Sequence, residues 1–287
     1  MAGEYINQHF VPVVYLKEFS VGGSASRKKS TVHYLSRKPR ADSSPVKTEN
    51  ECCGDFFYSR QHAEKAEKFF SETFENLYGL LKQRIYGGTV LKINESELFL
   101  TMVSLYLRNP AFENRVRRER IGAYFDLEFE FVHTFLKGSF PTAKPEDVPF
   151  LQMTQKWRVK TLKAEHTSEL RTSDNPVSML TTRAESSVQM ALMPVNPEVC
   201  VVAYDTDAVA VLKDTFSPED EEALNNLQYK QAQNCAYSRV EFTPQVESHI
   251  RDFWTRHPRK TGFLGDDHWH PMIQGYGAQL SFLNLKS

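Results

Sequence analysis

The sequence has few cysteines, and none has the spacing of a familiar metal or redox site. Its four cysteines are Cys52, Cys53, Cys200 and Cys235, and no pair shows the Cys-x-x-Cys spacing of zinc ribbons or thioredoxin-like centres. This usage indicates a reducing compartment, so we expect a cytoplasmic protein. The N-terminus has no basic segment followed by an apolar run, so no secretory signal is predicted.

Long apolar runs and net charge are also lacking. The longest apolar stretches, such as residues 199–204, are far shorter than the roughly 18 residues that suggest a membrane span. The formal net charge is -1, from 35 Lys and Arg against 36 Asp and Glu. The chain as a whole therefore lacks the positive field of a dedicated nucleic-acid binder. Because no apolar stretch is long enough for a membrane span, a soluble protein is expected.

Signatures of well-known hydrolases and nucleases are absent as well. The sequence has no Gly-rich phosphate loop, no HNH cluster, no strand-borne Asp followed by Glu-x-Lys, and no G-x-S-x-G elbow. No motif therefore indicates a substrate.

One segment near the N-terminus does carry charge of almost one sign. Its candidate phosphate contacts for a nucleic acid are Arg27, Lys28, Lys29, Arg37, Lys38 and Arg40. The alternative is that these are solvated loop charges. Other partners and the oligomeric state are left open.

The composition is that of a globular protein, with 40% hydrophobic and 12% aromatic residues. Apolar residues at helical spacing predict helices over residues 61–85, 94–109 and 112–137. After a proline-containing linker the period changes toward two, which predicts an antiparallel meander over residues 157–212. Short apolar segments at residues 10–16 and 31–35 predict N-terminal strands.

Helix-start signals define the last third of the chain. Ser217 followed by Pro218 predicts an N-cap and a first-turn proline for a helix over residues 218–236, and a further helix is predicted over residues 244–256.

The expected fold class is α+β, with a helical middle section packed against an antiparallel sheet built from the N-terminal strands and residues 157–212. We expect one domain over residues 1–243 and a C-terminal extension over residues 244–287. Within the domain, residues 1–60 hold N-terminal strands and the basic loop, residues 61–137 the helices, and residues 150–243 the sheet and a helix.

Three separated segments resemble, in order, a known family. They are NQHFVPVVYLKEFS from residue 7, LYLRNP from residue 105 and RTSDNPVSML from residue 171. Together they resemble the uncharacterised family catalogued as domain of unknown function 4238 (DUF4238). Weaker segments at residues 193–202 and 224–239 extend the resemblance, with Asn225 and Tyr237 among the matching positions. The family has no established activity, so the resemblance implies site positions without a chemistry.

The matching positions supply a candidate catalytic set of His9, Arg108, Asp174, Asn175 and Arg239. In the first hypothesis the protein is a hydrolase-like enzyme acting on a nucleic acid or nucleotide. Asp174 is then the reactive carboxylate, His9 a base or ligand, and the two arginines hold phosphate. A divalent metal ion held by His9 and Asp174 is the candidate cofactor.

The second hypothesis is a non-catalytic binding or regulatory module in which the same residues are structural. Asp and Asn before a proline favour turns because their side chains bond nearby backbone amides. A cation such as Arg108 at the end of a helix complements the helix dipole. Catalysis requires the side chains to meet in one solvent-reachable cleft, whereas structural roles require each of them to bond local backbone.

Overall fold

The computed structural model describes residues 7–23, 29–41, 44–55, 75–87, 92–108, 156–180, 189–256 and 280–285. The strands in these ranges are β1 (Asn7–His9), β2 (Thr31–Ser36), β3 (Val46–Lys47), β4 (Cys53–Asp55), β5 (Trp157–Ala164), β6 (Thr172–Ser173), β7 (Ser178–Leu180), β8 (Met190–Asn196), β9 (Val199–Asp205), β10 (Val209–Leu212), β11 (Thr215–Phe216), β12 (Cys235–Ser238) and β13 (Leu283–Leu285). The helices are α1 (Val13–Leu16), α3 (Asn76–Tyr86), α4 (Lys92–Leu107), α8 (Pro218–Gln231) and α9 (Pro244–Arg256), with short 3-10 turns at Lys17–Phe19 and Thr48–Asn50.

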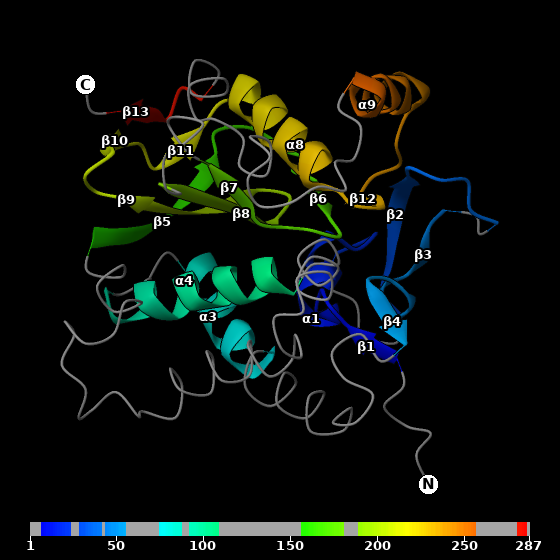
Figure 1. Ribbon diagram of the computed structural model, residues 1–287, viewed down its shortest axis with the longest axis horizontal. Coiled ribbons are helices and arrows are strands. Elements are labelled where there is room, and N and C mark those ends of the chain that lie inside the picture. Colours follow the sequence, from blue (N-terminus) through cyan, green and yellow to red (C-terminus); the bar gives the residue numbers. More distant parts are fainter. Residues whose placement is uncertain are drawn as a thin grey trace, which may run out of the picture.

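The largest sheet has the strand order β11-β5-β9-β8-β7 and lies between two helical layers (Figure 1). All its neighbouring strands are antiparallel except β11 and β5. The predicted α+β class is confirmed. The predicted antiparallel meander holds for β7, β8 and β9, whereas β5 pairs with β9 and β10 pairs with β13 outside this sheet.

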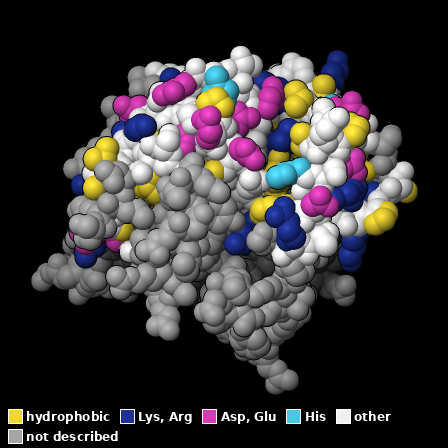
Figure 2. Space-filling view, turned by 90° about the horizontal axis from the view of Figure 1, so that it is seen from above, with side chains coloured by type: hydrophobic (Ala, Val, Ile, Leu, Met, Phe, Trp, Pro, Cys, Tyr) yellow, Lys and Arg dark blue, Asp and Glu magenta, His cyan; other side chains and the backbone are white. Residues whose placement is uncertain are grey.

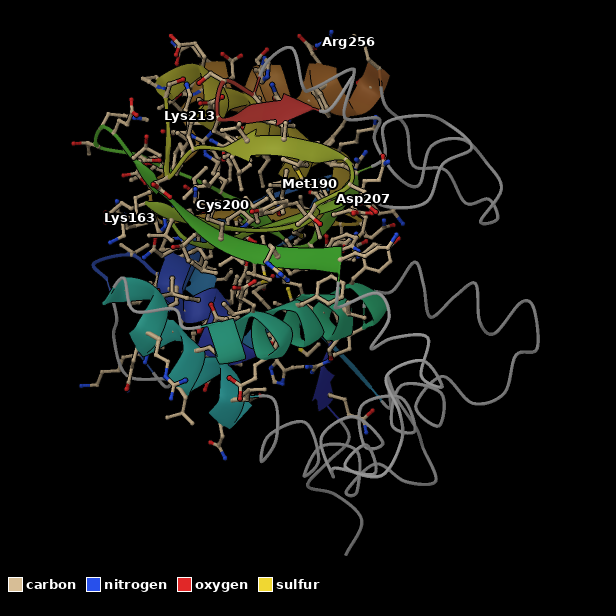
Figure 3. All side chains as sticks on the ribbon, turned by 90° about the vertical axis from the view of Figure 1, so that its left-hand side faces the viewer. Lys163, Met190, Cys200, Asp207, Lys213 and Arg256 are labelled. Atoms are coloured by element: carbon tan, nitrogen blue, oxygen red, sulfur yellow. The ribbon has the colours of Figure 1, made fainter. Side chains whose placement is uncertain are left out.

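Both faces of this sheet are covered, which explains why β8 and β9 are almost continuously apolar. Toward α8, the sheet presents Met190, Leu192, Cys200 and Val202, which cluster with Ala223, Leu224 and Leu227 of that helix. Toward α3 and α4, it presents Ala191, Met193, Val201 and Ala203, which cluster with Tyr78, Leu81 and Leu98. Figure 3 shows side chains filling the space on both sides of the sheet, with Met190 and Cys200 labelled.

The N-terminal strands do not join this sheet, which corrects the predicted arrangement. A second sheet has the order β3-β2-β12-β6, and β1 pairs with β4 alone. Residues 10–16 are not a strand either, because Pro12 precedes helix α1 at Val13. Strand β2 pairs with β12, which lies far along the chain, and Tyr34 is opposite Tyr237. Sequence periodicity predicts that a segment is a strand, but it does not identify the strand with which that segment pairs.

The helices follow the predictions in part. Helix α3 begins at Asn76, and the earlier part of the predicted helix at residues 61–74 lies outside the described residues, as does the whole predicted helix at 112–137. Helix α4 begins at Lys92, two residues before the predicted start at residue 94. Helix α8 has the predicted N-cap at Ser217, where Asp220 completes a capping box, but it ends at Gln231 instead of residue 236.

The described parts of the C-terminal extension complete the core. Phe253 and Trp254 of α9 are buried with Leu35 and Tyr229. Phe282 is buried against α8, and β13 pairs with β10. The buried carboxylate of Asp220 accepts a hydrogen bond from the Ser281 hydroxyl at 2.8 Å. Residues beyond 243 therefore contribute both to the packing and to the hydrogen bonding of α8.

None of the helices in the described ranges combines the length and apolarity that a membrane span requires.

Candidate functional site

Asp174 fixes the turn that connects α8 to β12. Its Oδ1 accepts the Gln233 amide and its Oδ2 the Asn234 amide, both at 2.7 Å. The side chain is nearly closed to solvent, since Asp174 is only 2% exposed. These bonds stop α8 at Gln231 and turn the chain into β12, so the observed geometry is that of a structural carboxylate.

The neighbouring motif residues bond the end of the same helix. The Asn175 side-chain amide donates to Gln231 Oε1 at 3.2 Å. The Ser173 hydroxyl donates to the Asn175 carbonyl at 2.8 Å, and Gln228 Nε2 donates to the Pro176 carbonyl at 3.0 Å. Asn175 is 1% exposed, so Ser-Asp-Asn-Pro forms a buried seam between β6 and α8.

Arg108 contacts His9, but it bonds the backbone carbonyl of His9 and not the imidazole ring. The Nη2 of Arg108 donates to the His9 carbonyl at 2.6 Å, and the His9 Nε2 lies 3.0 Å from the Glu49 carbonyl. Arg108 is 1% exposed, which places its guanidinium inside the protein. This contact ties the end of α4 to β1.

Arg239, the last residue of the predicted set, lies in a different setting. It pairs with Glu169 at 3.0 Å and with Glu198 at 3.3 Å, and its side chain is 28% exposed. It joins the loop before β6 to the turn between β8 and β9. The guanidinium charge of Arg239 is therefore compensated by these two glutamates.

Two of the basic residues predicted to touch nucleic acid point into the protein. Arg37 donates to the Ala232 carbonyl at 3.0 Å and lies over the Trp254 ring, 4.8 Å from its centroid. Arg40 pairs with Glu51. Lys29 and Lys38 are exposed, and Arg27 and Lys28 lie outside the described residues.

A buried polar cluster lies next to the Asp174 turn. The Tyr237 hydroxyl donates to Glu51 Oε2 at 2.9 Å, and the Cys52 thiol lies 3.4 Å from the same hydroxyl. Burial raises the pKa values of Cys52 and Tyr237 well above their usual range, and Asp174 and Glu51 add to the increase. Both groups therefore stay protonated at neutral pH, so Cys52 is not an activated nucleophile. Its φ of 54° is unusual for a residue with a side chain.

The two predicted metal ligands fit a metal poorly. Each carboxylate oxygen of Asp174 already accepts a backbone amide, and the His9 ring bonds the Glu49 carbonyl. Within the described ranges no group of three or more His, Cys, Asp or Glu side chains could hold a metal ion.

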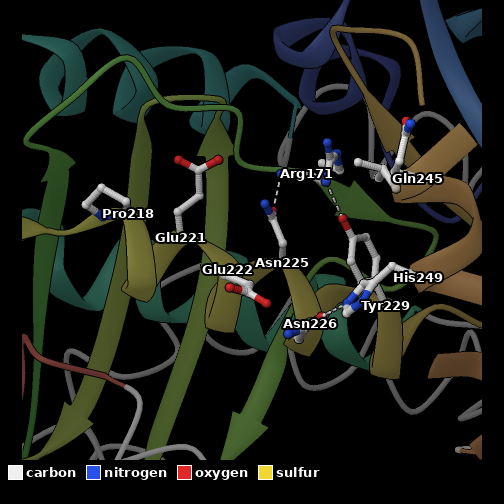
Figure 4. Close-up of a pocket in the computed structure, with 10 residues that line it drawn as sticks. Arg171, Pro218, Glu221, Glu222, Asn225, Asn226, Tyr229, Gln245 and His249 are labelled. Atoms are coloured by element: carbon white, nitrogen blue, oxygen red, sulfur yellow. Dashed lines mark hydrogen bonds between the residues drawn. The ribbon is translucent and has the colours of Figure 1, made fainter. Parts of the chain in front are cut away.

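A groove of about 350 Å³ lies between α8, α9 and the loop before β6 (Figure 4). Figure 2, which views the molecule from the side of these helices, shows Asp and Glu side chains gathered over the middle of this face, with Lys, Arg and His among them. The side chains that line the groove are Arg171, Pro218, Glu221, Glu222, Asn225, Asn226, Tyr229, Gln245, Val246 and His249. Those from α8 recur every three or four residues, so one face of the helix forms the floor.

Arg171 is held at one end of this groove by α8. Its backbone amide donates to Asn225 Oδ1 at 2.7 Å, and its Nη1 donates to the Tyr229 hydroxyl at 2.5 Å. Its guanidinium also lies 5.4 Å from the centroid of the Phe242 ring. Tyr229 is buried, which raises its pKa, while Arg171 partly offsets the increase. The hydroxyl therefore stays neutral and leaves the charge of Arg171 uncompensated.

The segment that leads to Arg171 carries several buried polar atoms without partners among the described residues. These are His166 Nδ1, Ser168 Oγ, Glu169 Oε2 and Arg171 Nε. Such atoms are uncommon in folded proteins and often belong to functional segments.

The groove residues other than Asn225 were missed by the sequence analysis. Arg171 heads the RTSDNPVSML segment, but nothing in the sequence pairs it with Tyr229, which lies 58 residues away. The one available signal was the polar face of the predicted helix, where residues 218, 222, 225 and 229 share one side.

Comparison with known proteins gives one match. Residues 7–137 match the model of a family described as protein of unknown function (DUF4238). No curated protein and no solved structure matches the chain. The match contains His9 and Arg108, whereas Asp174, Asn175 and Arg239 lie beyond it. The family match that the sequence resemblance predicted is therefore confirmed over residues 7–137.

Proposed function

We propose that this protein is a binding module and that the groove between α8 and α9 holds the anionic group of a small ligand. The observation that carries the proposal is Arg171, a partly buried guanidinium that lines the groove. Among the described residues it has no acidic partner. Its Nη1 donates to the neutral Tyr229 hydroxyl, its guanidinium lies over the Phe242 ring, and its buried Nε has no hydrogen-bond partner.

Other arginines of the chain set the comparison. Arg40, Arg239 and Arg251 each pair with at least one glutamate, while Arg37 donates to backbone carbonyls and does not line the groove. Removing a charge from water is unfavourable unless it gains a partner, so a half-buried arginine without one favours an incoming anion. The planar fork of a guanidinium suits a carboxylate or a phosphate, which accept two parallel hydrogen bonds.

Binding is favoured over the predicted hydrolysis because of the roles that the candidate residues have. Asp174 and Asn175 are buried and bond the end of α8, and Arg239 is occupied by two glutamates. A catalytic carboxylate needs a lone pair directed at a substrate proton or a metal. The binding hypothesis needs no such group.

The test is a titration of the full chain with sodium acetate and with inorganic phosphate. NMR monitors it through the backbone amide resonances of Arg171, Asn225 and Tyr229. We expect saturable shifts at millimolar concentrations for at least one anion, since a single charged contact gives weak affinity. Arg171→Gln should abolish them. Arg251→Gln, which removes an exposed charge on α9, is the matched control and should retain them. Unsaturable shifts, or shifts that persist in Arg171→Gln, would contradict the proposal.

A further inference from the structure

The groove has charges of opposite sign at its two ends. Figure 4 shows Glu221 and Glu222 toward one end and Arg171, Tyr229 and His249 toward the other, with Asn225 and Asn226 between them. A ligand that satisfies both ends carries an anionic and a cationic group. A simple anion would use only the Arg171 end.

The two acidic residues have different roles. Glu221 is fixed, because its Oε2 lies 2.7 Å from His166 Nε2 and its Oε1 accepts the Glu169 amide at 3.1 Å. Glu222 is exposed, and its carboxylate has no hydrogen-bond or ion-pair partner among the described residues. Glu222 is therefore the direct partner for a ligand cation, and Glu221 adds a fixed negative field beside it.

Helix geometry gives the distance between the two ends. Glu222 and Tyr229, which holds Arg171, are seven residues apart on α8, and an α-helix rises about 1.5 Å per residue, so the charged ends are separated by roughly 10 Å. An extended peptide rises about 3.3 Å per residue, so roughly three residues cover this span. The α-ammonium and α-carboxylate groups of a single amino acid are attached to one carbon atom, so these two groups cannot reach both ends.

The middle of the groove offers few groups for selecting side chains. The Asn225 amide bonds the Arg171 amide and the Glu169 carbonyl, and Asn226 Oδ1 lies 3.1 Å from His249 Nε2. These polar groups already have partners within the protein. Recognition therefore depends on the two charged ends and on the length between them.

We infer that the ligand of the groove is a free peptide of about three residues, with its C-terminal carboxylate on Arg171 and its N-terminal ammonium beside Glu222. This inference rests on the proposed function and adds the ligand class. The same carboxylate chemistry occurs at the C-terminal tail of a protein, which lacks a nearby terminal ammonium.

Calorimetric titration of the full chain with Ala-Ala-Ala and its blocked forms tests this inference. Amidating the C-terminus should weaken binding about tenfold or more, because it removes a charged hydrogen bond at a partly buried site. Acetylating the N-terminus should weaken binding about three- to fivefold, as expected for an exposed ion pair. Ala-Ala should bind as weakly as the acetylated tripeptide or more weakly.

Variants make each assignment specific. Acetylating the N-terminus of the tripeptide should no longer weaken its binding to Glu222→Gln. Amidating its C-terminus should no longer weaken its binding to Arg171→Gln. Glu241→Gln removes an exposed carboxylate that does not line the groove and should behave like the unaltered protein. Thermal unfolding of each variant verifies that it is folded.

The outcomes separate this inference from the proposed function. If acetate or phosphate binds at Arg171 but all forms of the tripeptide bind equally or not at all, the peptide assignment is wrong and the anion site stands. If the acetylated peptide binds as tightly as the free one while the amide does not, the groove takes a protein C-terminus and the free-peptide assignment is overturned. If neither anions nor peptides act through Arg171, both proposals fail.

Discussion

The carboxylate of Glu51 forms a bidentate ion pair with the guanidinium of Arg40, with Oε2 2.8 Å from Nη1 and Oε1 2.9 Å from Nη2. The two partners differ in burial, since the Glu51 side chain is 3% exposed and the Arg40 side chain 27%. Because Glu51 is buried with Tyr237 and Cys52, the pair compensates a charge inside the core.

Arg40→Met is expected to lower the free energy of unfolding by about 2–4 kcal/mol, because it leaves a buried carboxylate with only the Tyr237 hydroxyl. Urea unfolding measures the loss. Adding Glu51→Gln should recover part of it, since the unpaired charge is then removed. Lys38→Met, at an exposed position two residues away, is the control. A loss below about 1 kcal/mol would show that Glu51 is not buried as a charge.

Asp174→Asn should cost about 2–3 kcal/mol of stability, because one carboxylate oxygen is replaced by an amide that faces the backbone N–H of Gln233 or Asn234. Chemical denaturation provides the measurement. Asp207→Asn, on an exposed ion pair with Lys156, is the matched control and should change stability little. Unchanged stability in Asp174→Asn would remove the structural role and return Asp174 to the catalytic hypothesis.

Alkaline pH should destabilise the protein. Burial raises the pKa values of Tyr15, Tyr78 and Tyr237 well above 10.0 and that of Cys200 from 9.0 to about 12. These groups are neutral when protonated, so above about pH 9 the unfolded chain loses protons that the folded chain keeps. Their contribution is complete below that pH and is lost as pH rises, by up to about 1.4 kcal/mol per pH unit for each group.

Urea unfolding in steps from about pH 7.5 to about pH 10.5 measures this pH dependence. Cys200→Ala should reduce the slope above about pH 9 by nearly one proton, because it removes one of the shifted groups. A slope that is flat to pH 10.5, or identical in Cys200→Ala, would contradict the assigned burial.

Trp254→Ala is expected to cost about 3–5 kcal/mol, as for other large buried aromatic residues. Its ring is buried in the cluster that joins α8 and α9, and its Nε1 donates to the Tyr229 carbonyl at 2.9 Å. Because Tyr229 holds Arg171, the variant should also weaken anion binding in the groove. Asp252→Ala, on the exposed side of α9, should change neither stability nor binding. Retained stability in Trp254→Ala would show that α9 is dispensable for the core.

Local signals in the sequence were sufficient for several elements. Ser217 and Pro218 predicted where α8 starts, and the change of period toward two predicted strands from residue 157, where β5 begins. The end of α8 was not predictable, because it is set by Asp174, which directly follows β6 almost 60 residues earlier. Residues 10–16 were predicted as a strand, whereas Pro12 precedes α1, since proline suits both a strand edge and the start of a helix.

By itself the sequence determined the α+β class, most strands of the 157–212 region, the starts of α8 and α9, the DUF4238 relationship over residues 7–137 and the polar residue types available for a site. Short-range spacing encodes these features, because capping and amphipathic periods act within a few residues. Only the tertiary structure decided that Asp174 holds a turn and that Arg171 meets Tyr229 at a groove. Such pairings are set by packing between distant segments, where burial decides which charges find a partner in the chain and which remain for a ligand.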